Sequence, residues 1–153
     1  MSTINQLPNF ATVEEVVEEL TPGYPVYCLR PAELKRQASY FLETFPGRVM
    51  YAVKCNPHLA VLQALYDAGI RHFDTASLAE IALVREHLPQ ADCYFMHPVK
   101  PRAAIGTAQN VYGVDHFVID HEKELNKIID VTGGGDGKVV LVRIVTPVHD
   151  AQY

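Results

Sequence analysis

Five ionisable side chains stand at corresponding points of this sequence, where short apolar segments end. Lys54, Asp74, His97 and Asp120 each follow such a segment, and Arg143 lies within a fifth one. In a barrel of parallel strands, the side chains at the carboxyl ends of the strands face one mouth. We therefore expect these five groups to converge if the apolar segments are consecutive strands of one barrel.

Lys54 is the strongest candidate for catalysis. It follows the wholly apolar segment Val49–Val53, where we expect its ammonium to be partly desolvated. Desolvation favours the neutral amine and makes the residue a potential Schiff-base nucleophile. The alternative is a lysine that only extends into solvent from a strand end. His97 precedes a proline at a strand end, which favours a hydrogen-bonded structural role over a catalytic one.

Arg143 is expected to lie near an anion. The segment around it, Lys138–Val145, is otherwise largely apolar, and an unpaired charge in such a place is costly. Either a cofactor or a structural carboxylate could supply the compensating negative charge.

The elements that must position these residues alternate regularly after residue 48. Short apolar segments are predicted to be strands, and the segments between them are predicted to be helices. The strands are Val49–Val53, Arg71–Phe73, Cys93–Met96, His116–Ile119 and Lys138–Val145, and the helices are 59–68 (capped by Asn56-Pro57), Leu78–His87, Pro101–Tyr112 and His121–Asp130 (capped by Asp120). The strand centres recur roughly every 21 to 24 residues, which is typical of βα units with short loops.

Residues 1–47 are predicted to form a lead-in to this region. A helix over Thr12–Leu20 begins with a capping box of Thr12 and Glu15. An isolated strand over Pro25–Leu29 and a helix over Pro31–Thr44 follow it. Residues 48–153 then form the second unit of the chain.

Consecutive βα units build either an open doubly wound sheet or a (β/α)8 barrel. An open sheet of this kind usually carries a glycine-rich turn after its first strand, whereas residues 54–57 contain no glycine. The barrel is therefore favoured. A complete barrel needs eight strands and about 250 residues, so we expect residues 48–153 to be the first part of a truncated barrel. The glycine-rich segment 133–137 is expected to be an αβ turn on the opposite face, without a ligand role.

The composition and charge of the chain disfavour several classes of partner. The chain has 153 residues, 48% of them apolar, and 13 Lys and Arg against 18 Asp and Glu give a net charge of −5. A nucleic-acid partner is disfavoured because no basic stripe is present. Three distant cysteines without CxxC spacing indicate reduced thiols in a cytoplasmic protein. No signal peptide or bilayer-spanning segment is seen, and the histidines lack metal-ligand spacing, so neither a membrane nor a metal site is expected.

Several segments resemble the ornithine decarboxylase family, the fold-type III pyridoxal-phosphate decarboxylases. The segment YAVKCNP at 51–57 resembles the motif of the cofactor lysine in that family. Four more segments resemble the family in order and spacing: FDTAS with Glu80 at 73–80, HPVK at 97–100, GV followed by FVID at 113–120, and LVRI at 141–144. The resemblance covers most of the chain and implies a barrel of the alanine racemase-like type.

The resemblance also implies roles for four residues. Lys54 would bind pyridoxal 5'-phosphate covalently and act as the catalytic lysine. Asp74 and Arg143 would lie near the cofactor and orient Lys54 and the ring, with support from Glu80. The sequence from Ser77 to Glu80 also fits a capping box at a helix start, which explains Glu80 without catalysis.

The most specific expectation is an ornithine decarboxylase that makes putrescine for polyamine biosynthesis and forms a homodimer at full length. Cys55 and the segment ASLAE at 76–80 favour this branch over diaminopimelate decarboxylases. Departures at Thr75, His97 and Val99 leave open which basic amino acid is the substrate. Family segments that bind the phosphate and the ring nitrogen follow the fifth strand, so the 153-residue chain alone is expected to be inactive.

Two alternatives remain open at this point. The chain could be a non-catalytic, decarboxylase-like module that binds a partner chain. It could also resemble the small pyridoxal-phosphate carrier proteins, although those close all eight strands in one chain.

Overall fold

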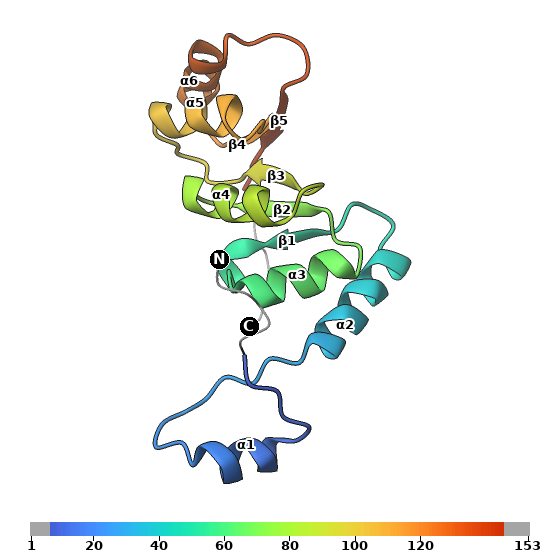
Figure 1. The fold of residues 1–153 in the computed structure, drawn as a ribbon. Coiled ribbons are helices and arrows are strands. Elements are labelled where there is room, and N and C mark those ends of the chain that lie inside the picture. Colours follow the sequence, from blue (N-terminus) through green and yellow to red (C-terminus); the bar gives the residue numbers. More distant parts are fainter. Residues whose placement is uncertain (1–6, 146–153) are drawn as a thin grey trace.

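The computed structural model describes residues 7–145, which contain a single sheet of five parallel strands. The strands are β1 (Met50–Ala52), β2 (His72–Thr75), β3 (Asp92–Phe95), β4 (His116–Ile119) and β5 (Val139–Val142). Each strand pairs with the next one in the chain, so the spatial order is β1-β2-β3-β4-β5 (Figure 1). A doubly wound sheet reverses its strand order at a switch point, whereas a barrel keeps the chain order. The partial (β/α)8 barrel expected from the sequence is confirmed.

Two of the helices in residues 7–145 precede β1, and the others each follow a strand, as βα units require. The helices are α1 (Val13–Leu20), α2 (Pro31–Thr44), α3 (Leu59–Asp67), α4 (Leu78–His87), α5 (Arg102–Asn110) and α6 (Glu122–Thr132), with one 3₁₀ turn, η2 (Val53–Cys55), directly after β1. Figure 1 shows α3 to α6 along one side of the curved sheet and α1 set apart from it. None of the helices in residues 7–145 is long and apolar enough to cross a bilayer.

The hydrophobic core lies between the sheet and these helices. Successive side chains of a strand point to opposite faces, and the alternate residues Phe73, Phe95 and Phe117 face the helices. Each of α3 to α6 contributes a fully buried aliphatic residue to the same cluster: Leu62, Ile81, Ile105 and Ile128. Burial of these side chains supplies the main driving force for folding of the described part.

The other face of the sheet is the barrel side, and it carries polar residues on β2, β3 and β4. Ala52, Asp74, Tyr94 and His116 are aligned across β1 to β4 on this face. The hydroxyl of Tyr94 accepts a hydrogen bond from Arg48 Nη1 at 2.8 Å, and the Tyr94 and His116 rings have centroids 4.3 Å apart. The interior of the partial barrel is therefore held by hydrogen bonds and ring contacts as well as by apolar packing.

The structure confirms several predicted elements and corrects others. The helices Pro31–Thr44 and Leu78–His87 and the strand His116–Ile119 have the predicted bounds. The predicted strand Pro25–Leu29 is wrong, because this stretch pairs with no strand in residues 7–145 and Tyr27 is fully exposed. An extended segment becomes a strand only when a partner supplies backbone hydrogen bonds.

Two helix caps also differ from the prediction. His58, and not Asn56-Pro57, caps α3 by accepting the Ala60 N–H on Nδ1 at 3.2 Å. His121, and not Asp120, caps α6 by accepting the Lys123 N–H on Nδ1 at 3.0 Å. Asp120 therefore does not cap α6. It lies directly after β4, at the carboxyl edge of the sheet.

The segment 133–137 is the αβ turn that the sequence predicted. Gly133 ends α6 with φ at 75°, in the left-handed region that glycine adopts without strain. The turn then enters the amino end of β5. It lies at the opposite edge of the sheet from Lys54 and the other strand-end residues.

We predict that Phe117→Ala destabilises the chain by about 3–5 kcal/mol, because it removes a fully buried ring from the middle of the core. Tyr27→Ala, at a fully exposed ring, should change the free energy of unfolding by less than about 0.5 kcal/mol. Urea unfolding of both variants measures the difference. Equal effects would contradict the assignment of the core.

Candidate functional site

The carboxyl edge of the sheet carries the residues that the sequence singled out. Lys54 lies in the 3₁₀ turn η2, two residues beyond Ala52, the last residue of β1. Ala52 pairs with Asp74 of β2, so Lys54 and Asp74 emerge at adjacent strand ends. Lys54 is exposed, so the desolvation expected for its ammonium is wrong for this structure.

Asp74, Lys54 and Glu80 form one electrostatic group. Burial raises the pKa of Asp74 above its ordinary value, the nearby charge of Lys54 opposes this rise, and Glu80 adds to it. The structure places Lys54 and Asp74 at adjacent strand ends, and Glu80 in the first turn of the helix that follows Asp74.

Glu80 has a structural role as well. In α4, the Ser77 hydroxyl accepts the Glu80 N–H at 3.3 Å, and Glu80 Oε2 accepts the Ala76 N–H at 2.8 Å. This arrangement is the predicted capping box, with the carboxylate on the residue before the cap. Glu80 therefore fixes the loop between β2 and α4 and places a negative charge near Asp74 at the same time.

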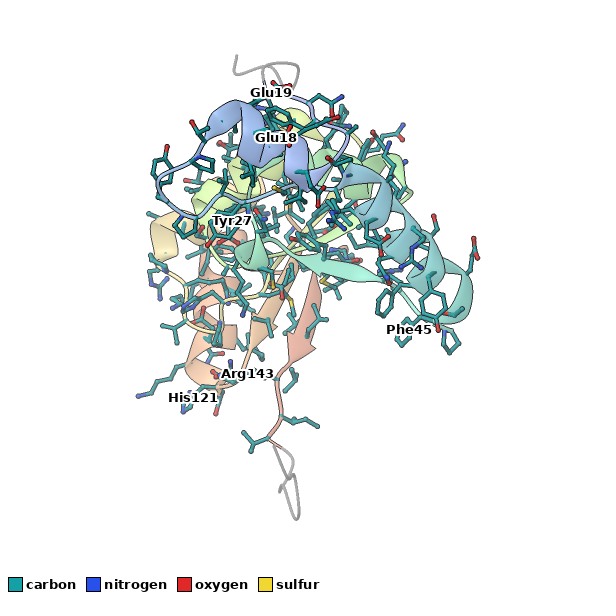
Figure 2. The ribbon with its side chains drawn as sticks, turned by 90° about the horizontal axis from the view of Figure 1, so that it is seen from below. Glu18, Glu19, Tyr27, Phe45, His121 and Arg143 are labelled. Atoms are coloured by element: carbon teal, nitrogen blue, oxygen red, sulfur yellow. The ribbon has the colours of Figure 1, made fainter. Side chains whose placement is uncertain are left out.

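Arg143 lies at the other end of the same edge. It follows the last residue of β5 and is not inside the strand as predicted. Its backbone N–H donates to Ile119 O at 2.7 Å, and its Nη2 donates to Asp120 Oδ2 at 2.6 Å. Figure 2 shows Arg143 near His121, which follows Asp120 in the chain.

The anion expected near Arg143 is thus the carboxylate of Asp120. The side chain of Arg143 is 58% exposed and that of Asp120 is 30% exposed, so this pair lies at the surface of the described part. The sequence named both residues as strand-end groups but did not pair them. Their separation of 23 residues, about one βα unit, is the signal that would have done so.

The edge between these two groups is occupied by the end of β3 and the loop after it. His97 is exposed, and its Nδ1 accepts the Val99 N–H at 3.2 Å, which is the structural role favoured by the sequence. Lys100, the last residue of the HPVK segment at 97–100, had no role assigned to it from the sequence; it is only 1% exposed and pairs with the buried Glu124. The sequence signals of this pair are a lysine five residues beyond the end of β3 and a glutamate in the first turn of α6.

Comparisons with known proteins agree with this architecture. Residues 31–153 match the model of the family described as pyridoxal-dependent decarboxylase, pyridoxal binding domain. The chain is 37% identical over 91 residues to antizyme inhibitor 2 of Rattus norvegicus, covering 58% of this chain and 20% of that protein. It is 38% identical over 78 residues to ornithine decarboxylase of Panagrellus redivivus, covering 51% of this chain and 18% of that protein.

A solved structure shows the same fold. The lysine/ornithine decarboxylase from Vibrio vulnificus, complexed with putrescine, superposes with a TM-score of 0.72 at 29% identity, covering 86% of this chain and 35% of that one. The chain thus spans about a fifth of the curated relatives and about a third of the solved one.

We predict that the pKa of Asp74 responds in opposite directions to the loss of its two charged neighbours. Lys54→Met should raise it, because a stabilising cation is removed. Glu80→Gln should lower it, because a like charge is removed while the amide oxygen still accepts the Ala76 N–H. NMR titration of the Asp74 carboxyl carbon measures both changes, and shifts of the same sign would contradict the grouping.

The raised pKa of Asp74 also predicts how the free energy of unfolding changes with pH. The folded-state pKa of Asp74 lies above the ordinary value of 3.8, so the folded state binds this proton more tightly than the unfolded state does. The carboxyl therefore favours unfolding as the pH rises from 3.8 through the raised pKa. Asp74→Asn should remove this contribution from urea midpoints measured across that pH range.

Proposed function

Because this chain belongs to the pyridoxal-dependent decarboxylases through their pyridoxal-binding domain, we propose that it is the amino-terminal part of a decarboxylase of basic amino acids. The family binds pyridoxal phosphate. The observation that most supports the proposal is the placement of Lys54 and Asp74 at adjacent strand ends, with Glu80 in the first turn of the helix that follows Asp74. This grouping combines an amine with carboxylates at the edge where barrels carry their chemistry.

The residues at this edge fit the cofactor. Lys54 is exposed, so the aldehyde of pyridoxal phosphate can reach its amine. Arginine has five N–H donors, and Asp120 accepts from only one nitrogen of Arg143, Nη2. The exposed guanidinium therefore retains donors for an anionic group of the cofactor or substrate.

Each residue then has a distinct task. Lys54 would hold the cofactor through its exposed side-chain amine. Asp74 orients the amine of Lys54 through its charge, and Glu80 fixes the loop that follows Asp74 by binding the Ala76 N–H. The pair of Arg143 and Asp120 holds the carboxyl ends of β5 and β4 together at the same edge. When bound, pyridoxal phosphate accepts the electron pair released as carbon dioxide leaves.

Ornithine is the proposed substrate, with putrescine as the product. Similarity to ornithine decarboxylase of Panagrellus redivivus and to a lysine/ornithine decarboxylase solved with putrescine supports this choice. Because the chain spans a minor part of both relatives, the proposal refers to a whole protein that includes further segments. A homodimer and a role in polyamine biosynthesis belong to the same proposal.

A second candidate is a non-catalytic module that binds a partner chain. The similarity to antizyme inhibitor 2, whose name describes an inhibitor and not an enzyme, favours it. The two candidates share the fold, so the fold cannot separate them. They differ in whether Lys54 reacts with pyridoxal phosphate.

We predict that borohydride reduction in the presence of pyridoxal phosphate labels Lys54 ahead of the other lysines. Peptide mapping by mass spectrometry identifies the labelled residue. Lys35 is the matched control, because it is also exposed but is paired with Asp67 on the helix side. Equal labelling of both lysines, or none of Lys54, would refute the catalytic role and favour the non-catalytic module.

We also predict that the 153-residue chain by itself releases no carbon dioxide from carboxyl-labelled ornithine, lysine or arginine. It carries Lys54 and the neighbouring charges but only about a third of the length of the solved relative. Scintillation counting of trapped carbon dioxide provides the measurement. Turnover above that of the Lys54→Met variant would show that these residues suffice for catalysis.

A further inference from the structure

We propose that Lys100 is a positioning residue: its buried ammonium joins the carboxyl ends of β3 and β4 where the sheet opens, and so fixes Asp120 and Arg143. This inference depends on the proposed function in one respect: it assumes that Arg143 belongs to the cofactor site. Lys100 itself has no contact with Arg143, so its effect must pass through the backbone of β4.

The ladder of paired residues between β3 and β4 is shorter than the other ladders of the sheet. These strands pair only at Tyr94 with His116 and at Phe95 with Phe117, whereas the ladders of β2–β3 and β4–β5 each contain four pairs. Beyond Phe117 the backbone of β4 has no β3 partner in the ladder. Some other group must then satisfy the polar atoms at this point.

Two carbonyl groups face each other across this opening. Ile119 O accepts the Arg143 N–H from β5, and strand carbonyls alternate in direction, so Val118 O points toward β3. Just beyond β3, the Met96 N–H donates to Thr75 O of β2 at 2.9 Å, and the His97 carbonyl accepts from Lys100 Nζ, which also donates to Val118 O. Both groups are acceptors, and the last pair of the β3–β4 ladder, Phe95 with Phe117, precedes them.

Lys100 supplies the missing donors. Its Nζ donates to Val118 O at 2.6 Å and to His97 O at 3.0 Å, and it lies 3.1 Å from Glu124 Oε1. An ammonium has three N–H donors, and these three acceptors match them one for one. The side chain therefore extends the β3–β4 connection beyond the end of the backbone ladder.

Glu124 makes the burial of this cation possible. It is 6% exposed, and its Oε1 also accepts the Lys100 N–H at 3.0 Å while Lys127 Nζ lies 2.5 Å from Oε2. Residues from the β3–α5 loop and from α6 are thereby held together around one buried charge pair. A buried charge is tolerated when it is paired and hydrogen-bonded in this way.

The effect reaches the site through two residues of β4. Val118 precedes Ile119, whose carbonyl accepts the Arg143 N–H at 2.7 Å, and Ile119 precedes Asp120, which binds the Arg143 guanidinium. The hydrogen bond from Lys100 Nζ to Val118 O fixes the position of the end of β4. Without that bond, we expect the end of β4 to move and both contacts of Arg143 to loosen.

The experiment compares Lys100→Met with a matched control in the 153-residue chain. Arg102 and Asp130 form an ion pair of 3.1 Å that also links α5 to α6, but both side chains are about 60% exposed. Lys100→Met should accelerate hydrogen exchange of the Arg143 amide by about tenfold or more and leave the Phe73 amide of β2 unchanged. Arg102→Met should change neither rate, and an unchanged Arg143 rate in Lys100→Met would overturn the proposal.

A second variant covers the case in which Lys100→Met does not fold. The double variant Lys100→Met with Glu124→Met removes both buried charges, and such replacements commonly preserve the fold. It still leaves Val118 O and His97 O without a donor, so the Arg143 amide should again exchange faster. Protection equal to that of the parent would overturn the proposal, since the buried pair would then not be what fixes β4.

Binding of pyridoxal phosphate, followed by absorbance, separates this inference from the proposed function. If the parent binds the cofactor, Lys100→Met should weaken its affinity and Arg102→Met should not. If the parent does not bind it, the proposed function fails, whereas the exchange rates of Arg143 still decide the positioning role. Fast exchange with parental affinity would show that Lys100 fixes β4 without serving the cofactor site, which overturns the role proposed here.

Discussion

Parallel backbone hydrogen bonding between consecutive strands is the constraint on which the rest of this structure depends. It places the carboxyl ends of β1 to β5 along one edge, so residues about one βα unit apart in the chain become neighbours. Asp120 and Arg143, separated by 23 residues, meet in this way. The same pairing fixes which side chains face the helices and which face the barrel interior, because alternate residues of a strand point to opposite faces.

Charges at the carboxyl edge are arranged according to their burial. Lys54 is exposed beside the half-buried Asp74, and Arg143 is mostly exposed beside Asp120. Lys100 and Glu124, which lie deepest, are fully paired. This order follows from the cost of removing a charge from water. An exposed charge stays hydrated and needs no protein partner, whereas a buried charge is stable only when it is paired within the protein. The exposed amine and guanidinium are thus available to a ligand, while the buried pair is structural.

The family relationship and the geometry support each other at the same residues. The match to the pyridoxal-binding domain begins at residue 31, the first residue of α2, and continues through all five strands. The polar barrel face, with Tyr94 bound to Arg48 and stacked near His116, lies on the same side of the sheet as Asp74. In closed barrels of this class that side is the interior and chemistry is carried at the carboxyl ends of the strands, so the strand-end charges lie at the edge that the proposed function requires.

Local sequence determined those features that depend on a few neighbouring residues. The capping box at Ser77 predicted the start of α4, and the apolar run at His116–Ile119 predicted β4. The regular spacing of βα units and the absence of glycine at 54–57 were sufficient for the partial barrel and for the edge at which Lys54 and Asp74 lie. Only the tertiary structure decided whether a segment finds a partner. Pro25–Leu29 has strand-forming residues but pairs with no strand among residues 7–145. Arg143 finds its anion in Asp120, and Lys100 joins two carbonyls that nothing in the sequence places face to face. The physical reason is that hydrogen bonds and ion pairs between residues about 20 positions apart form only after the strands have paired, and pairing depends on the whole sheet and not on the local pattern.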